Sequence, residues 1–213
     1  MSLLLGDCLE LLPDACPAPA VIVTDPPYGT GGAGQRYRGA RLGDGLQVEK
    51  HSILNDGDTT YRDRLLALYP DTPAYVFGAL TMPPPPGTVQ TLIYAKRESP
   101  YVGGMGARNG WRRNVEAVHM VGPWPVGKPE RSSIIQSTQS ATGSRHGHPH
   151  AKPLDVLCRL LEASPPGLVL DPFAGSGTTL LAADYLQRPW IGIELEPAHH
   201  ATATANLAQC GLW

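Results

Sequence analysis

The sequence predicts an α/β fold in which a mostly parallel central sheet is flanked by helices. The evidence is three short apolar runs, at residues 20–24, 167–170 and 189–193. They are mostly aliphatic and do not alternate with polar residues, as expected of strands that are buried on both faces. Leucines and alanines recur at helical spacing over 178–187, which makes a strand–helix–strand unit with the last two runs. A chain of 213 residues suits a single domain.

Several further elements are predicted from local patterns. Leu154, Leu157 and Leu161 form one apolar stripe after Pro153, which favours a helix over 153–163. Weaker patterns predict helices near 60–68 and 198–207, and strands near 74–77, 91–95 and 116–121. Two stretches rich in glycine and proline, 29–58 and 101–147, show no regular pattern. Loops of this length in a compact domain are usually functional or disordered.

Composition excludes several classes of protein. Cys8, Cys16, Cys158 and Cys210 are scattered without a C-x-x-C pair, so neither a disulfide framework nor a zinc knuckle is expected. The first residues lack the basic flank of a secretion signal, and no apolar run approaches the roughly 20 residues that span a bilayer. We therefore expect a cytoplasmic protein. Its net charge of -2 is not that of a typical nucleic-acid binder, although arginines cluster locally.

A glycine-rich segment, Asp-Pro-Phe-Ala-Gly-Ser-Gly-Thr-Thr at 171–179, follows a predicted strand and opens a predicted helix. Its glycines let backbone N–H groups approach a ligand closely, and the helix N-terminus favours a negative group. Glu194 ends the next predicted strand, where nucleotide-binding folds place an acid on ribose hydroxyls. This arrangement predicts a nucleoside site. The glycine spacing differs from dinucleotide and P-loop fingerprints, which disfavours NAD and ATP.

A second motif, Asp25-Pro26-Pro27-Tyr28, directly follows the first apolar run. Two prolines lack N–H donors and hold the backbone extended, so their carbonyls are free to accept hydrogen bonds from an amino group. Tyr28 offers an aromatic face for a planar base, at a gain of roughly 1 to 3 kcal/mol. A merely rigid turn is an equally good interpretation of these four residues alone.

The two motifs together resemble the amino-specific DNA methyltransferases, and their order resembles the β group of that family. The resemblance implies a Rossmann-like fold with circularly permuted motif order and S-adenosylmethionine as cofactor. It implies catalytic roles for Asp25, Pro26, Pro27 and Tyr28. Leu-Gly-Asp-Cys at 5–8 and His-Pro-His-Ala-Lys-Pro at 148–153 resemble further family elements, although His150 and Ala151 replace the usual Thr and Gln. The implied cofactor-binding residues are Asp7, Cys8, Asp25, His148, Lys152, Asp171, Phe173, Ala174, Gly175, Ser176, Gly177, Thr178 and Glu194.

The resemblance further implies a double-stranded DNA substrate in a bacterial or phage-infected cell. The target base must leave the duplex to be methylated, at a cost of a few kcal/mol. Adenine N6 is the expected target. The loops 29–58 and 101–147 are expected to recognise the site, and the candidate DNA contacts are Arg36, Arg38, Trp111, Arg112, Arg113, Lys128 and Arg131. A homodimer is one option for the assembly.

Four alternatives remain open. Cytosine N4 is the other amino target, although that type more often has Ser at the first motif position. RNA or a protein amide is a less favoured substrate given the permuted motif order. A non-catalytic cofactor-binding or DNA-binding module is a different class of function. His146, His148 and His150 alternate as metal ligands can, but no separate acid or cysteine ligand accompanies them, so no metal is expected.

Overall fold

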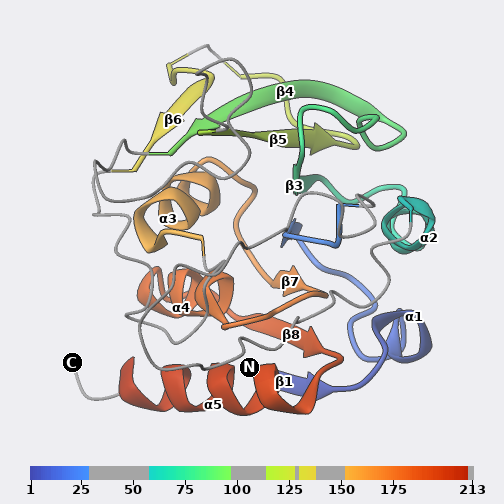
Figure 1. Ribbon diagram of the computed structural model, residues 1–213, viewed down its shortest axis with the longest axis vertical. Coiled ribbons are helices and arrows are strands. Elements are labelled where there is room, and N and C mark those ends of the chain that lie inside the picture. Colours follow the sequence, from blue (N-terminus) through green and yellow to red (C-terminus); the bar gives the residue numbers. More distant parts are fainter. Residues whose placement is uncertain (29–57, 97–113, 128–129, 138–151, 211–213) are drawn as a thin grey trace, which may run out of the picture.

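The computed structural model describes residues 1–28, 58–96, 114–127, 130–137 and 152–210, in which eight strands form one sheet (Figure 1). The strand order is β1-β8-β7-β2-β3-β5-β4-β6. The strands are β1 (Ser2–Leu5), β2 (Val21–Thr24), β3 (Ala74–Gly78), β4 (Thr88–Ala95), β5 (Val115–Val121), β6 (Ile134–Gln136), β7 (Val169–Asp171) and β8 (Trp190–Glu194). β5 runs antiparallel to its neighbours β3 and β4, and the other pairs are parallel. The prediction of a mostly parallel sheet is confirmed.

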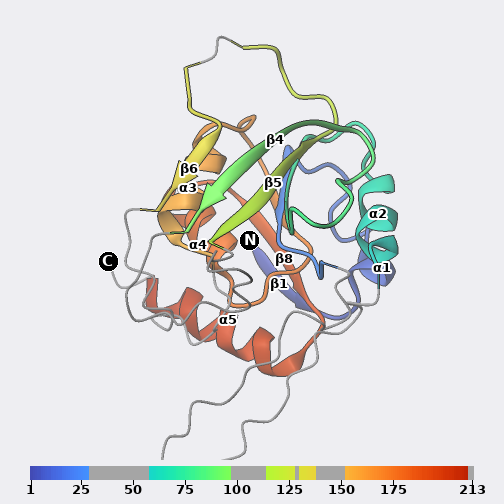
Figure 2. The same cartoon turned by 45° about the horizontal axis from the view of Figure 1, so that its top comes forward.

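Helices cover both faces of this sheet (Figures 1 and 2). On one face lie α3 (Leu154–Glu162), α4 (Thr178–Tyr185) and α5 (Pro197–Cys210). On the other lie α1 (Cys8–Leu11) and α2 (Thr60–Ala67). β2 shows why its sequence lacks alternation: Val21 and Val23 pack on the side of α3 and α4, while Ile22 packs on the side of α1 and α2. All four β2 residues are buried, as predicted for a strand covered on both faces.

The close packing of α4 against β8 depends on a glycine. A Cβ atom at Gly192 would lie only 2.5 Å from Cδ1 of Leu180, so a larger residue at this position would displace the Leu180 side chain. At its N-terminus α4 begins after Gly177, whose φ of 79° lies in the left-handed region. These two glycines fix where the segment 171–177 enters the helix.

The predicted elements occur near the predicted positions, and three short ones were missed. β1 and α1 were not predicted from residues 2–11. Beyond the strand near 116–121, no element was predicted within 101–147, and this is wrong at 134–136, where β6 pairs with the edge of β4. Only Ile135 of β6 is buried, so the sequence carries too little periodicity to indicate a strand. Within the described segments, no helix is long and apolar enough to cross a bilayer.

Candidate active site

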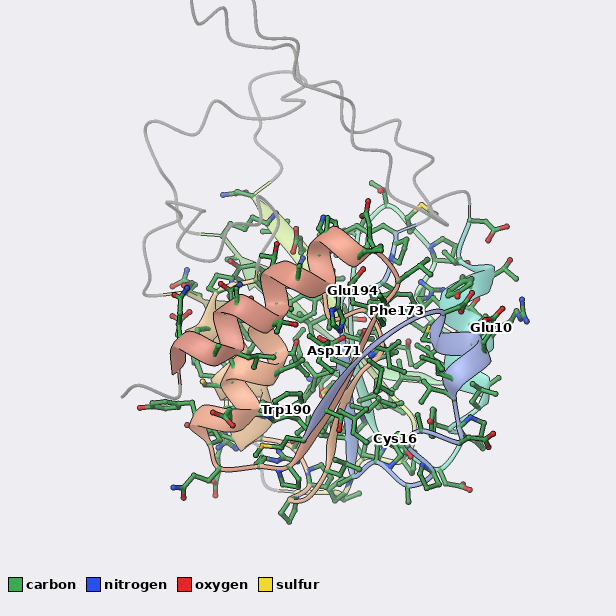
Figure 3. The ribbon with its side chains drawn as sticks, turned by 90° about the horizontal axis from the view of Figure 1, so that it is seen from below. Glu10, Cys16, Asp171, Phe173, Trp190 and Glu194 are labelled. Carbon is green, nitrogen blue, oxygen red and sulfur yellow. The ribbon has the colours of Figure 1, made fainter. Side chains whose placement is uncertain are left out.

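Four neighbouring parallel strands end at one edge of the sheet, and an acidic residue lies at or just after each end. Asp7 follows β1, Glu194 ends β8, Asp171 ends β7 and Asp25 follows β2. Figure 3 shows Asp171 and Glu194 gathered at this edge together with Phe173. In open α/β sheets, ligands bind outside the carboxyl ends of the strands. The two sequence motifs lie at neighbouring strand ends, because β2 and β7 pair directly.

Glu194 holds the glycine loop in place. Its Oε2 accepts a hydrogen bond of 2.7 Å from the N–H of Gly175, and its Oε1 accepts one of 2.8 Å from the N–H of Glu196. Gly175 has a φ of 53°, a left-handed conformation that glycine adopts at no steric cost. Each carboxylate oxygen can accept a further hydrogen bond, and a sugar hydroxyl is a suitable donor. The structure thus brings the predicted loop and the predicted acid together.

Asp171 is turned into the protein and is only 2% exposed. Its Oδ1 accepts hydrogen bonds from the N–H of Phe173 at 3.1 Å and from the hydroxyl of Thr24 at 3.0 Å. Burial raises the pKa of this carboxyl group to about 7, against the opposing effect of these hydrogen bonds and one from Thr179. The carboxyl group therefore fastens the loop after β7 to β2, and its cofactor role by resemblance remains a prediction.

An aromatic pair adjoins Asp7 at the far end of this edge. The Asp7 carboxylate caps α1 by accepting from the N–H of Leu9 at 2.8 Å, and it also accepts from the hydroxyl of Tyr61. The Tyr61 ring meets the ring of Phe173 edge-on, with centroids 5.9 Å apart and an interplanar angle of 61°. Burial and the adjacent Asp7 raise the pKa of the Cys8 thiol to about 12, so the thiol is uncharged.

Sequence reasoning missed Tyr61. It lies on α2, distant along the chain from both motifs, and no local pattern distinguishes it from a core aromatic residue.

Asp25 lies in a compact network with Tyr28 and Lys152. The Tyr28 hydroxyl donates to Oδ1 of Asp25 at 2.8 Å, and Nζ of Lys152 lies 2.6 Å from Oδ2. Lys152 also donates to the Tyr28 hydroxyl at 3.0 Å. Burial alone would lower the pKa of Lys152, but Asp25, Tyr28 and Glu116 hold it well above its ordinary value. The Asp25 side chain keeps 31% exposure, against 11% for Lys152, so it can still be reached from outside.

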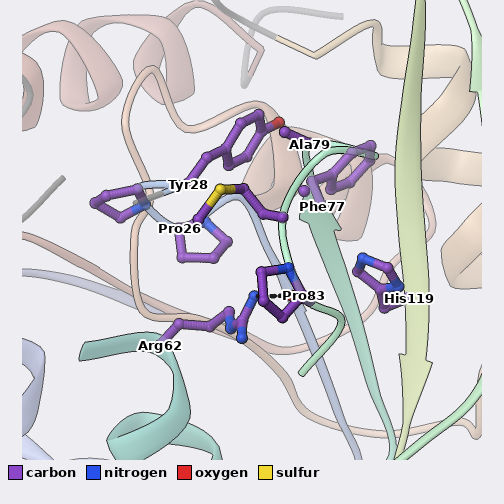
Figure 4. A pocket seen from close by; sticks show the side chains of 10 residues that line it. Pro26, Tyr28, Arg62, Phe77, Ala79, Pro83 and His119 are labelled. Carbon is purple, nitrogen blue, oxygen red and sulfur yellow. Dashed lines mark hydrogen bonds between the residues drawn. The ribbon is translucent and has the colours of Figure 1, made fainter. Parts of the chain in front are cut away.

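A narrow hollow lies beside the Asp25–Tyr28 segment (Figure 4). Pro26, Tyr28 and Phe77 line one part of it, and Arg62 and His119 another. The Arg62 guanidinium donates to the carbonyl of Pro83 at 3.1 Å and pairs with Asp63 at 2.8 Å. Burial and the nearby Arg62 lower the pKa of His119, so its ring is neutral at pH 7. The hollow is thus narrow and lined by both apolar and polar side chains.

Most of the predicted DNA contacts lie outside the described residues. Of these candidates only Arg131 is described, and it is exposed. Outside the described residues lie Arg36, Arg38, Trp111, Arg112, Arg113, Lys128 and the cofactor candidate His148. His146 and His150 of the alternative metal site also lie outside them. Among the residues that the structure describes, no group of three or more His, Cys, Asp or Glu residues could hold a metal ion.

Comparison with known proteins identifies the family. Residues 84–205 match the family model for DNA methylases of the N6/N4 type. YubD, a methylase-like protein of Escherichia coli, is 30% identical over 220 residues, which cover 95% of this chain and 88% of YubD. The chain belongs to the N6/N4 DNA methylase family. The type II methyltransferase M.EcaI of Enterobacter cloacae is 50% identical to this DNA methylase over 50 residues. That segment covers 22% of this chain and 11% of M.EcaI.

Solved structures show the same fold. The M1.HpyAVI–SAM complex superposes with a TM-score of 0.61 at 20% identity, over 96% of this chain and 98% of the other. The cytosine-N4-specific PvuII DNA methyltransferase gives a TM-score of 0.65 at 18% identity, over 95% of this chain and 84% of the other. The prediction of a Rossmann-like methyltransferase fold is confirmed.

Proposed function

We propose that this DNA methylase transfers a methyl group from S-adenosylmethionine to N6 of an adenine that is flipped out of double-stranded DNA. The observation that carries the proposal is the pairing of β2 with β7. This pairing sets segment 25–28, whose oxygens can accept hydrogen bonds from an amino group, directly beside the glycine loop 171–177. Transfer reactions gain most of their rate from such proximity and alignment.

The residues at the edge of the sheet fit the cofactor. The glycine loop and the start of α4 offer N–H groups for a carboxylate. Glu194 offers carboxylate oxygens for ribose hydroxyls, and the rings of Tyr61 and Phe173 lie next to Asp7, where an adenine ring would be bound. When bound, the cofactor supplies a sulfonium methyl group: its C–S bond breaks as the N–C bond forms, sulfur keeps the electron pair, and the amino nitrogen loses a proton to solvent.

Asp25 and the carbonyl of Pro26 accept hydrogen bonds from the target amino group, which orients the nitrogen and makes its lone pair available. Both carboxylate oxygens of Asp25 already have a partner, yet each can accept a second hydrogen bond. Tyr28 donates its hydroxyl to Asp25, and its aromatic ring offers a face on which the target base can stack. No side chain needs to form a covalent intermediate.

Cytosine N4 is the second candidate target. The fold likeness to the PvuII enzyme favours it, because that enzyme is specific for cytosine N4. Adenine is preferred because Asp rather than Ser stands at position 25, the choice more typical of adenine enzymes in the family that the motif resembles.

The deciding experiment is incubation of the purified protein with labelled S-adenosylmethionine and unmethylated duplex DNA of mixed sequence, followed by nucleoside analysis. We expect label in N6-methyladenine. Label in N4-methylcytosine would favour cytosine N4 as the target instead. Label only in RNA or peptide counter-substrates would refute the proposed function.

A variant pair tests the assigned role of Asp25. Asp25→Ala should abolish transfer while S-adenosylmethionine binding, measured by calorimetry, persists. Asp71→Ala removes an exposed carboxylate elsewhere and should leave transfer unchanged. Full transfer by Asp25→Ala would contradict the assignment.

Recognition of a specific DNA site is assigned to the loops 29–58 and 101–147, with Arg131 as one phosphate contact. Sequencing of methylated DNA from an expressing host would define the site. Arg131→Ala should weaken binding to all duplexes alike and reduce its salt dependence, because a phosphate contact carries no sequence information.

A further inference from the structure

Lys152 stands between two carboxylates, only one of which belongs to the recognised motifs. Its Nζ lies 2.6 Å from Oδ2 of Asp25 and 3.2 Å from Oε2 of Glu116. The side chains of Lys152 and Glu116 are only 11% and 13% exposed. The same ammonium lies 5.0 Å from the centre of the Phe77 ring, which adds a favourable cation–π contact. The position of the Lys152 ammonium is thus defined from several sides.

Glu116 reaches this network from a different part of the fold. It lies on β5 opposite Tyr94 of β4, and Oε1 of Glu116 pairs with the ammonium of Lys96, just after β4. The other oxygen, Oε2, is buried and lies 3.2 Å from the Lys152 ammonium. A carboxylate is costly to bury unless it is paired, and the Lys152 ammonium is the partner of this buried oxygen.

The position of Glu116 affects how much of the negative charge of Asp25 the Lys152 ammonium cancels. With Asp25 as its only partner, Lys152 would form a simple ion pair and cancel most of the negative charge of that carboxylate. A second carboxylate beside the ammonium offsets part of its charge. The Lys96 side chain, whose ammonium pairs with the other oxygen of Glu116, is 43% exposed, so solvent screens its charge. Asp25 therefore retains a net negative field on its exposed side. That is where an amino group gains positive charge as its nitrogen forms a new bond to carbon.

We infer that Glu116 is a positioning residue for methyl transfer, which holds the Lys152 ammonium where it orients Asp25 and Tyr28 without neutralising Asp25. The inference rests on the proposed function. It assigns Glu116 a role in the rate of transfer and none in binding of the cofactor, since Glu116 lies on β5, on the opposite side of β2 from the glycine loop.

The test compares Glu116→Gln with wild type in single-turnover transfer to DNA. We expect the rate to fall about tenfold while KM for S-adenosylmethionine stays within about twofold, the pattern of an interaction that acts mainly in the transition state. Glu116→Asp should recover part of the rate. Glu162→Gln, which removes an exposed carboxylate on α3, is the matched control and should behave as wild type.

A double-variant cycle separates action through Lys152 from a general structural effect. In a Lys152→Met background, the further change Glu116→Gln should leave the remaining rate nearly unchanged, because its effect passes through the missing ammonium. Independent, multiplicative losses would overturn the inference. If Glu116→Gln does not fold, Glu116→Asp takes its place in the cycle.

The outcomes distinguish the two proposals. A wild-type protein that methylates no DNA contradicts the proposed function and the inference with it. An active wild type with an equally active, folded Glu116→Gln variant contradicts the inference alone, as does a variant whose only defect is a raised KM for the cofactor.

Discussion

Replacing Asp171 by Asn tests how much stability the protein loses when the buried carboxyl group at this position ionises. Asp171 is almost fully buried, and burial raises the pKa of its carboxyl group from an ordinary 3.8 to about 7. Asn has the same shape and keeps an oxygen that can accept from Thr24 and Phe173. Its amide group donates where the carboxylate accepts from the Thr179 hydroxyl, which can rotate to accept instead. The substitution therefore removes the charge and keeps most of the contacts.

The expected size and sign of the change in stability with pH follow from the pKa of Asp171. A carboxyl group with a higher pKa in the folded state binds its proton more tightly when folded, so the protein loses stability as the pH rises from about 4 to about 7. The loss is about 1.4 kcal/mol per pH unit, and so up to about 4 kcal/mol over this range. Asn does not ionise. Its stability relative to wild type should therefore increase with pH across this window and level off above about pH 7.

The measurement is denaturant unfolding of both proteins at several pH values between 5 and 8, with the two-state assumption checked by two probes. The decisive quantity is the difference in free energy of unfolding between Asp171→Asn and wild type. A difference that does not change with pH would refute the reasoning, because it would mean that Asp171 has the same pKa in the folded and unfolded states. A constant offset added to the predicted slope would only report the altered hydrogen bond.

Two substitutions test the glycines that position the site. Gly177→Ala places a side chain at a φ of 79° and its Cβ 3.1 Å from that of Ala203, so we expect about 1 to 3 kcal/mol of destabilisation and weaker S-adenosylmethionine binding in calorimetry. Gly192→Ala should destabilise by about 1 to 3 kcal/mol through its clash with Leu180, seen as a lower Tm. Gly127→Ala, whose added Cβ meets no atom of the described residues beyond its chain neighbours within 4 Å, is the control for both and should be neutral. Wild-type stability of either variant would contradict the packing argument.

The parts of the site that the sequence predicts are those whose signal is local. The segment 171–179 contains a strand end, two glycines and a helix start within nine consecutive positions, so its conformation is encoded where it stands. Asp25 to Tyr28 is encoded in the same way, because prolines restrict the backbone whatever surrounds them. Local encoding also explains why the buried strands β2, β7 and β8 are predicted: each is mostly apolar and shows no alternation with polar residues.

The parts that the sequence does not predict depend on contacts between distant segments. Tyr61 joins Asp7 and Phe173 only because α1 and α2 pack together on one face of the sheet. Glu116 is one acid in a predicted strand, and nothing near it in sequence indicates that Lys152 will lie 3.2 Å away. The strand order itself cannot be read from the motifs, since β1 and β8 are adjacent in the sheet but lie near opposite ends of the chain.

Because of this strand order, the cofactor side of the site and the side proposed to face the target amino group are built from different parts of the chain. The cofactor side is built from both ends of the described chain: β1 pairs with β8, the N–H of Gly6 donates to the carbonyl of Glu194, and Asn206 of α5 donates to the carbonyl of Ser176. The side proposed to bind the target amino group comes from the middle of the strand order, where Asp25 follows β2. Asp171 joins the halves through its hydrogen bond to Thr24, the last residue of β2. The buried carboxyl group therefore couples the geometry of the glycine loop to that of the segment 25–28, which we propose receives the target amino group.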